Sequence, residues 1–347
     1  MFPGLRRGGE PRCGLLLSYA VQVVNGPHRV LSDSVHALVG SRLPHAVELP
    51  PLVSPTRDEI YLRTGRGDTL LAVSTLTHSV VARRPVQGGP GAMRADGEAL
   101  FVIASENQVD SLYTLAPGTL DAVSVAPMPP GPQRFGPLAA GRPGRIYLVG
   151  TDHQTGVTWI DVVDTGSGAE LARLEVSATA SSNERTFLAV SPDGSRLYVA
   201  KASEVIAVDV STDSPDVVDT TTLPYTIGAL ALAPDGARLY VGRAWLSTAV
   251  VDVLDAATFS SIRQVPAPGL FNIFATSEHL YLSLGLDGRP GDRYFLSGDV
   301  VRLDRATLSE VDRRGFVMVP SWIGVSRDGS FLYAQGPTST TLVVPTW

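Results

Sequence analysis

The sequence predicts an all-β fold, a closed seven-bladed β-propeller with four antiparallel strands per blade. One hairpin motif recurs about every 45 residues, and its copies carry an aromatic residue at a constant position. No stretch shows the sustained 3.6-residue apolar period of an amphipathic helix. The 347 residues exceed the size of most single hydrophobic cores. Because the 34 Gly and 26 Pro are spread along the chain, they indicate many turns and not one linker.

The clearest copies of the motif are residues 187–200 and 229–242. The first reads Phe-Leu-Ala-Val-Ser-Pro-Asp-Gly-Ser-Arg-Leu-Tyr-Val-Ala, and the second has the same residue at nine of these fourteen positions. In the shared Pro-Asp-Gly, Pro presets φ, Asp caps the turn and Gly accepts a positive φ. Each copy is therefore a hairpin whose returning strand carries Leu-Tyr-Val.

Weaker copies of the hairpin complete the set of blades. Each contains an aromatic register mark, and seven marks predict seven blades: Tyr61, Phe101, Tyr147, Tyr198, Tyr240, Tyr281 and Tyr333. A third strand is expected after each hairpin, at residues 70–73, 112–115, 159–162, 205–208, 249–253, 300–303 and 342–344. A more variable outer strand such as 262–265 follows, which gives four strands per unit.

The last unit ends after only three strands, which would leave a sheet edge unpaired. We expect an N-terminal strand, residues 45–49, to complete the C-terminal blade and close the ring. The propeller is expected to span residues 29–347. Residues 1–28 form a separate N-terminal segment that is either a weak export signal or an extra strand.

The repeats at Ser191-Pro-Asp-Gly with Leu197-Tyr-Val-Ala and at Pro234-Asp-Gly with Leu239-Tyr-Val-Gly resemble the YVTN-type repeat of bacterial surface-layer and periplasmic propellers. That resemblance implies seven blades and, often, an extracytoplasmic protein; the compartment is otherwise left open. The family borders propellers that do chemistry, lactonases among them. Lys201 and Arg243 stand where the repeat often has Asn, and at a loop entrance they would alter the chemistry of the lining.

Composition argues against several classes of partner and cofactor. The net charge is −6 with both signs interleaved, so nucleic acid is not expected as a partner. No apolar run reaches the roughly 18 residues of a membrane span, so no membrane insertion is expected. Cys13 is the only cysteine, and the six histidines lack metal-ligand spacing, so neither a metal nor another cofactor is predicted.

The candidate site follows from the expected topology. Links from an outer strand to the next first strand, and from a second strand to its third, open on one face, where a channel mouth forms. The ligand-binding residues that we nominate are Arg134, Asn183, Arg185, Tyr225, Arg243 and Trp322. They suit a small anionic or aromatic ligand, or a loop of a protein partner. Two arginines on neighbouring loops would clamp one carboxylate or phosphate; alternatively each pairs with a nearby acid such as Glu184 and stiffens its loop.

The leading functional hypothesis is a non-catalytic binding or scaffold propeller, because no nucleophile elbow or ligand set is recognisable. The alternative is a lactonase-type hydrolase or other small-molecule enzyme that uses the same face. It would need a general base near an oxyanion-stabilising group, and His153 with Arg243 or Arg185 is the only such pair in the sequence that we nominate.

Overall fold

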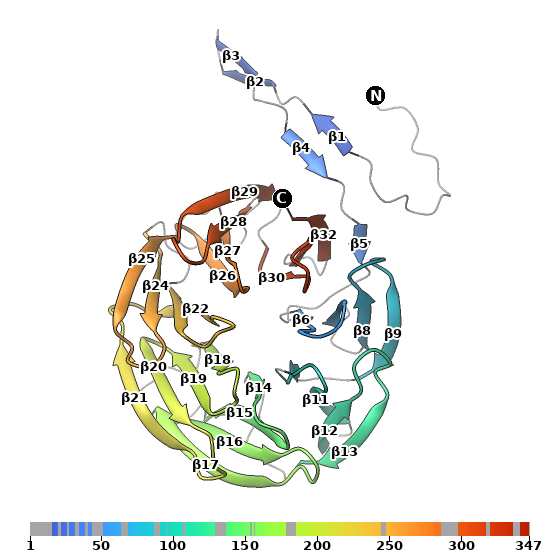
Figure 1. Ribbon diagram of the computed structural model, residues 1–347, viewed down its shortest axis with the longest axis vertical. Helices are drawn as coiled ribbons and strands as arrows, with labels where there is room; N and C mark the ends of the chain where they lie inside the picture. The colour runs from blue at the N-terminus through green and yellow to red at the C-terminus, as the bar shows by residue number, and fades with distance from the viewer. Residues whose placement is uncertain are drawn as a thin grey trace.

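The protein was analysed as a computed structural model that describes most of the chain. The described residues are 16–19, 22–25, 28–31, 35–38, 41–43, 51–63, 69–86, 91–94, 96–106, 109–128, 137–152, 155, 157–177, 185–243, 248–285, 298–316, 320–335 and 341–346. In this part of the chain the regular structure is entirely β-strand. Seven four-stranded antiparallel sheets are arranged in a ring around a central axis (Figure 1). The predicted fold class, a seven-bladed β-propeller, is confirmed.

Strands run outward from the axis in chain order in blades 1 to 6. Blades 1 to 3 comprise β6 (Leu52–Val53), β7 (Glu59–Arg63), β8 (Thr69–Ser74), β9 (Val80–Pro85); β10 (Gly91–Met93), β11 (Leu100–Glu106), β12 (Val109–Leu115), β13 (Ala122–Pro127); and β14 (Leu138–Ala140), β15 (Arg145–Thr151), β16 (Thr158–Asp164), β17 (Glu170–Ser177). Blades 4 and 5 comprise β18 (Thr186–Val190), β19 (Arg196–Lys201), β20 (Glu204–Asp209), β21 (Asp216–Thr222); and β22 (Ile227–Leu232), β23 (Arg238–Arg243), β24 (Val250–Asp255), β25 (Ser261–Pro266).

The last two blades complete the ring. Blade 6 comprises β26 (Leu270–Ala275), β27 (His279–Gly285), β28 (Gly298–Asp304) and β29 (Glu310–Phe316). Blade 7 comprises β30 (Trp322–Val325), β31 (Phe331–Gln335) and β32 (Thr341–Pro345), with β5 (Ser41–Leu43) as its outer strand. The predicted third strands therefore coincide with β8, β12, β16, β20, β24, β28 and β32.

An N-terminal strand does close the last blade. β5 pairs antiparallel with β32, with Leu43 opposite Thr341 and Ser41 opposite Val343. The predicted closure is confirmed, but the closing strand is Ser41–Leu43; residues 45–49 follow it and lie outside the described residues. The sequence pattern misplaced this strand because only three residues pair, too few for an alternation to stand out.

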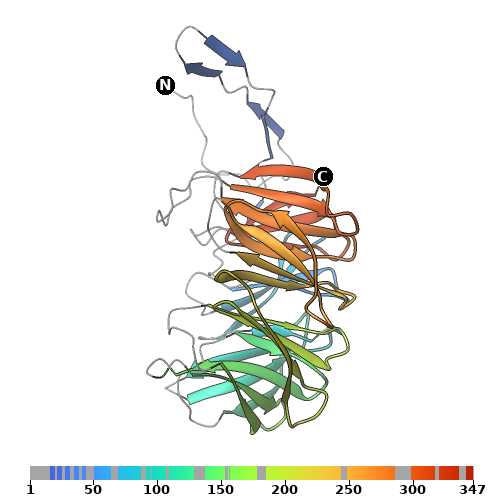
Figure 2. The ribbon, with the colours of Figure 1, turned by 90° about the vertical axis from the view of Figure 1, so that its left-hand side faces the viewer.

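Four further strands precede the ring. β1 (Leu16–Tyr19) pairs with β4 (Val35–Leu38), and β2 (Gln22–Asn25) pairs with β3 (His28–Leu31). The β2–β3 hairpin thus lies between the two strands of the β1–β4 pair in the chain, and both strand pairs project from the ring near β5 and β29 (Figures 1 and 2). The predicted division of the chain at residues 28 and 29 stays a prediction.

The hydrophobic core lies between the blades and not within one central mass. Seven clusters of buried side chains each join two consecutive blades, because every four-stranded sheet has two apolar faces. The last of these clusters joins Ile60 and Val73 of blade 1 to Tyr333 and Val343 of blade 7. Apolar packing thus closes the ring independently of the β5 pairing.

The aromatic register marks have a common structural role. All seven are buried, and several hydroxyls reach the turn of the next blade. Tyr147 Oη donates to the Val210 carbonyl at 3.3 Å, and Tyr198 Oη donates to the Ala256 carbonyl at 2.9 Å. Each register tyrosine therefore fills an inter-blade core, and Tyr147 and Tyr198 also tie their hydroxyls to the neighbouring blade. The Tyr61 hydroxyl instead donates to Glu59 of its own strand at 2.6 Å, and the Tyr240 hydroxyl has no hydrogen-bond partner among the described residues.

The Pro-Asp-Gly turns have the predicted conformation. Gly194 and Gly236 both adopt φ +72°, which a side chain would strain. The Asp193 carboxylate accepts hydrogen bonds from the Ser191 hydroxyl at 2.5 Å and from the Ser195 amide at 3.1 Å. These bonds, with the Ser191 bond the largest cause, lower the pKa of Asp193 to about 2.

Acid should therefore weaken this turn. The folded-state pKa of Asp193 lies below its ordinary value of 3.8, so its stabilising contribution is present above that value and is lost as the pH falls toward 2. We expect Asp193→Asn to melt at a lower temperature than the wild type at pH 7, with a difference that shrinks between pH 4 and pH 2. Calorimetry across this range checks the prediction; a difference independent of pH would contradict it.

Candidate ligand-binding face

The two faces of the ring differ in the length of their links. The turn face carries the first-to-second and third-to-fourth strand links, which span three to six residues. Blade 7 has no third-to-fourth link, because its outer strand β5 precedes the other strands in the chain. On the opposite loop face, the second-to-third and fourth-to-first links include residues 44–51, 128–137, 178–185 and 286–297. Because binding residues concentrate on long loops held by a rigid scaffold, the loop face is the candidate binding face.

Two of the nominated residues meet on the loop face between blades 4 and 5. Tyr225 lies just before β22, and Arg243 is the last residue of β23. The Arg243 Cζ atom lies 5.8 Å from the centroid of the Tyr225 ring, within the range of a cation–π contact. Tyr225 is buried and Arg243 is half-buried, so the ring forms a fixed platform for a guanidinium that solvent reaches.

The buried carboxylate of Asp252 holds the Tyr225 ring in place through its hydroxyl. The Tyr225 hydroxyl donates to Oδ2 of Asp252, and Gln264 Nε2 donates to Oδ1 at 2.7 Å. Asp252 is 4 % exposed, and both of these hydrogen-bond donors are neutral groups. Burial raises the pKa of Tyr225 and the bond to Asp252 raises it further, so the phenol stays a protonated donor. The carboxylate therefore holds the ring that supports Arg243.

Arg243 differs from the other arginines that face carboxylates. Arg145 pairs with Asp164 at 2.6 Å and with Asp213 at 2.7 Å. Within the part of the chain that the structure describes, Arg243 makes no ion pair and is held by stacking alone. A positioned guanidinium whose fork-shaped donors are not occupied by a carboxylate suits a bidentate anion.

Buried carboxylates on other blades are neutralised directly. Asp161 of β16 accepts from Arg173 Nε at 2.7 Å and from Trp159 Nε1 at 3.3 Å, while the Arg173 guanidinium lies 4.9 Å from the Trp159 ring. Asp299 of β28 pairs with Arg313 at 2.9 Å. Arg173 and Arg313 therefore pair with buried carboxylates of their own sheets, whereas Arg243 of blade 5 makes no ion pair among the described residues.

The other nominated residues lie on other blades or outside the described residues. Arg185 is exposed at the start of blade 4, the blade that precedes Arg243. Trp322 opens β30 of blade 7, is half-buried and lies opposite the buried Gln335 in the strand register. Arg134, Asn183 and the candidate base His153 lie outside the described residues.

Lys201 has a different position from the one expected. It is 2 % exposed, and its Nζ donates to Thr158 Oγ1 and to Thr151 Oγ1 of blade 3, the latter at 3.3 Å. It therefore links two blades and does not line a loop entrance. The expectation failed because a strand-end position does not reveal whether a long side chain turns to solvent or into the inter-blade seam.

Sequence reasoning missed Asp252 and Gln264, the two residues that hold the Tyr225 ring. Asp252 interrupts the apolar third strand Val-Val-Asp-Val-Leu, which is the signal that could have found it. Gln264 carried no signal, because polar residues are ordinary in an outer strand. On blade 1, Arg63 ends β7 on the loop face, and burial lowers its pKa to about 10.

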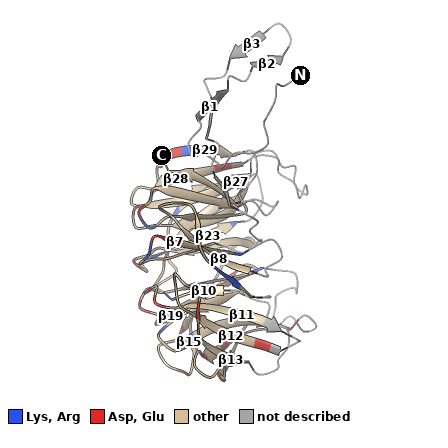
Figure 3. Cartoon of the chain, turned by 90° about the vertical axis from the view of Figure 1, so that its right-hand side faces the viewer, with Lys and Arg blue, Asp and Glu red and all other residues tan. Residues whose placement is uncertain are grey.

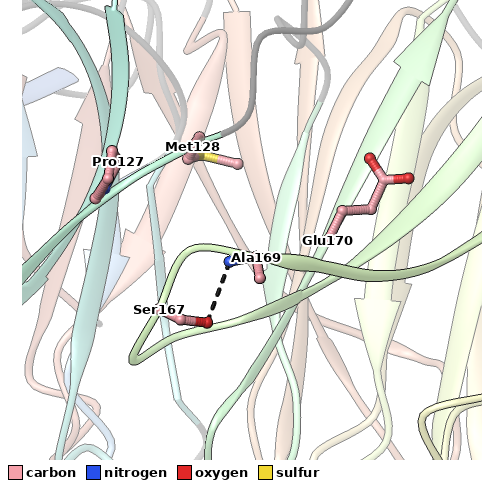
Figure 4. A pocket seen from close by; sticks show the side chains of 5 residues that line it. All are labelled: Pro127, Met128, Ser167, Ala169 and Glu170. Carbon is pink, nitrogen blue, oxygen red and sulfur yellow. Dashed lines mark hydrogen bonds between the residues drawn. The ribbon is translucent and has the colours of Figure 1, made fainter.

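Two hollows lie elsewhere on the ring. A groove on the rim between blades 2 and 3 is lined by Pro127, Met128, Ser167, Ala169 and Glu170 (Figure 4). It is open, and its one charged residue, Glu170, already pairs with Arg173 at 2.9 Å. A second hollow lies on the turn face among the turns of blades 2 to 4 and contains Arg94 and Arg142, which pair with Asp96 and Asp213. Neither offers a cation without a carboxylate.

The remaining charge distribution favours no other class of site. On the side seen in Figure 3, the basic and acidic residues of the described strands are interspersed. Among the described residues, no three His, Cys, Asp or Glu side chains are grouped to hold a metal ion. The same residues include no helix long and apolar enough to cross a membrane.

The protein is a seven-bladed β-propeller, as its closed ring, seven four-stranded blades and inter-blade cores show. Solved structures of similar fold are known. The chain is similar to a chain of the mitotic checkpoint complex (13 % identity, TM-score 0.66, covering 96 % of this chain and 99 % of that one). It is also similar to the Cps50 (Swd1) β-propeller domain of Myceliophteria thermophila (12 %, 0.64, 89 % and 99 %) and to hydrazine synthase of Kuenenia stuttgartiensis (17 %, 0.62, 89 % and 99 %). No family profile and no curated protein matches the chain. At these identities the likeness concerns the fold.

Proposed function

We propose that the protein is a non-catalytic binding propeller that holds an anionic ligand, or an acidic loop of a protein partner, on its loop face. The observation that carries the proposal is Arg243, stacked on a ring that Asp252 fixes and free of any ion pair among the described residues. A carboxylate or phosphate would complete the coordination of this guanidinium, and an aromatic group on the ligand would add apolar contact. Arg134, Asn183, Arg185 and Trp322 remain proposed contributors from neighbouring loops.

The YVTN-type family assignment, with its bacterial and extracytoplasmic implications, is part of this proposal. Its support is the Pro-Asp-Gly hairpins with buried tyrosines in successive blades. Within that family and its neighbours, a binding role needs only a positioned cation and loops around it. Hydrolysis would need a general base, and the nominated His153 lies outside the described residues.

Substitution of Arg243 should separate ligand binding from stability. A charge-assisted hydrogen bond contributes about 1.5–3 kcal/mol, so Arg243→Ala should weaken binding of an anionic ligand roughly 10- to 100-fold. Mono- and dicarboxylates, aromatic carboxylates and inorganic phosphate are screened by thermal shift, and the dissociation constants of the hits are measured by isothermal titration calorimetry. Arg134→Ala and Arg185→Ala are measured in the same way.

Arg263→Ala is the matched control, because Arg263 lies on the rim and its guanidinium donates to the Thr307 carbonyl at 2.8 Å. This variant should bind as the wild type does. Unchanged affinities in Arg243→Ala would refute the proposed site. A screen without anionic hits would refute a small anion as the ligand and leave an acidic partner loop, which a pull-down comparing wild type with Arg243→Ala then accepts or rejects.

A further inference from the structure

The rim of the ring is made of edge strands, and the structure shows how their free backbone groups are protected. Six of the seven outer strands, β9, β13, β17, β21, β25 and β29, each have a register shift close to the turn that precedes them. The seventh, β5, pairs over three residues without a shift. Bulges of this kind bend an edge away from flat pairing with another strand. Because all six of these strands have the bulge, the bulge alone does not determine which outer edge can pair with an added strand.

Five of these six outer strands carry a second protective feature. Proline or arginine lies in the stretch that follows the bulge: Pro85 in β9, Pro127 in β13, Arg173 in β17, Pro266 in β25 and Arg313 in β29. Proline removes a donor from the edge, and a long charged side chain must be desolvated before another strand can approach. Strand addition to these five edges is therefore disfavoured.

β21 of blade 4 has neither protection. Its sequence Asp-Val-Val-Asp-Thr-Thr-Thr contains no proline and no basic residue, and six of its seven residues are exposed. Val217 and Val218 are 38 % and 48 % exposed. Valine and threonine have high strand propensity. Among the six outer strands, β21 is therefore the most open to pairing with an added strand.

One edge amide of β21 is covered only by a side chain of the strand itself. The Thr220 N–H donates to Asp219 Oδ1 at 2.8 Å, so it is directed away from β20. The register shift places Asp216 opposite Asp209 and Asp219 opposite Ala207, positions two residues apart on β20, so both aspartates share one face of the blade. An added strand that paired with the Thr220 N–H would release the Asp219 carboxylate next to its own side chains.

We propose that β21 is a strand-addition site for an extended segment of a partner protein that carries basic residues at alternate positions. The partner's backbone would pair with the outer edge at Thr220 and Thr222, and its basic side chains would lie beside Asp216 and Asp219. Charge complementarity favours this occupant, because the strand bears two carboxylates, no cation, and the whole chain has a net charge of −6. The site is on the rim and is independent of Arg243.

The test uses the full-length protein and a labelled extended peptide, Arg-Val-Arg-Val-Arg-Thr, in fluorescence anisotropy at low salt and at about 150 mM salt. Thr220→Pro removes the outward N–H while keeping the ladder to β20, since edge strands tolerate proline where the N–H faces solvent. We expect it to weaken peptide binding at least tenfold. Asp219→Arg should do the same by repelling the peptide, and a peptide with Glu in place of Arg should not bind.

Asp312→Arg in β29 is the matched control, because Asp312 also accepts from the following amide, that of Arg313, at 2.7 Å. It should bind the peptide as the wild type does. Equal binding to wild type, Thr220→Pro and Asp219→Arg would overturn the proposal, as would an absence of binding to wild type. A wild-type dimer that Thr220→Pro dissociates in sedimentation, without peptide binding, would instead identify a second copy as the occupant.

Discussion

Deletion of residues 1–43 should lower the melting temperature by about 5–10 °C, because it removes the outer strand of blade 7. β5 is opposite Thr341, Leu342 and Val343 of β32, and without it that strand becomes an unpaired edge. Loss of the hydrogen bonds across these three residue pairs corresponds to about 2–3 kcal/mol, and each kcal/mol shifts the melting temperature of a large domain by about 2–4 °C. Differential scanning calorimetry measures the shift.

Deletion of residues 1–40 is the control, because it removes the strand pairs β1–β4 and β2–β3 and keeps β5. It should melt close to the full-length protein. If both truncations melt at the same temperature, the β5 pairing does not stabilise the ring, and closure depends on the apolar cluster between blades 7 and 1 alone.

Gly269→Ala should be the most destabilising of the glycine substitutions, by about 2–5 kcal/mol. Gly269 adopts φ +75° in the link to β26, and a Cβ placed there would overlap the Gly285 carbonyl oxygen. Backbone strain and a clash with backbone atoms add, and a backbone atom cannot move aside as a side chain can. Urea unfolding of the purified variant gives the change in free energy of unfolding.

Gly329→Ala isolates the strain from the clash. Gly329 has nearly the same conformation, φ +74°, but a Cβ there would meet no atom within 4 Å. We expect this variant to lose only about 1 kcal/mol. Equal losses in the two variants would mean that the close approach between Gly269 and Gly285 contributes nothing and that positive φ accounts for the whole effect.

The number of blades was predictable from the sequence because every blade packs against its neighbour through the same aromatic position. A buried tyrosine fills each seam except that at Phe101, and the Pro-Asp-Gly turns fix the hairpin register, so both leave a periodic trace. The closing strand left no such trace, because Ser41–Leu43 pairs over only three residues and comes from the far end of the chain. Its existence was predictable from the incomplete last unit, and its position was not.

The sequence predicted which face of the ring carries the candidate site, but not which side chains contact one another there. Strand order places Tyr225, which precedes β22, and Arg243, which ends β23, at the loop-face end of blade 5, so both could be nominated from topology. Their contact depends on Asp252 and Gln264, which come from two other strands and hold the ring through hydrogen bonds. Lys201 shows the opposite case, where an apparently equivalent strand-end cation turns into the seam toward Thr158. Side-chain direction at strand ends is set by inter-blade packing, which a single repeat does not encode.

The central claim, that Arg243 receives an anion on the loop face, is tested most directly by locating a bound anion. Crystals soaked in a brominated aromatic carboxylate, with anomalous diffraction recorded at the bromine edge, would give its position. We predict an anomalous peak beside the Arg243 guanidinium, lost in Arg243→Ala crystals soaked in the same way. A peak only in the turn-face hollow near Arg94 and Arg142, or one that persists in the variant, would contradict the assignment.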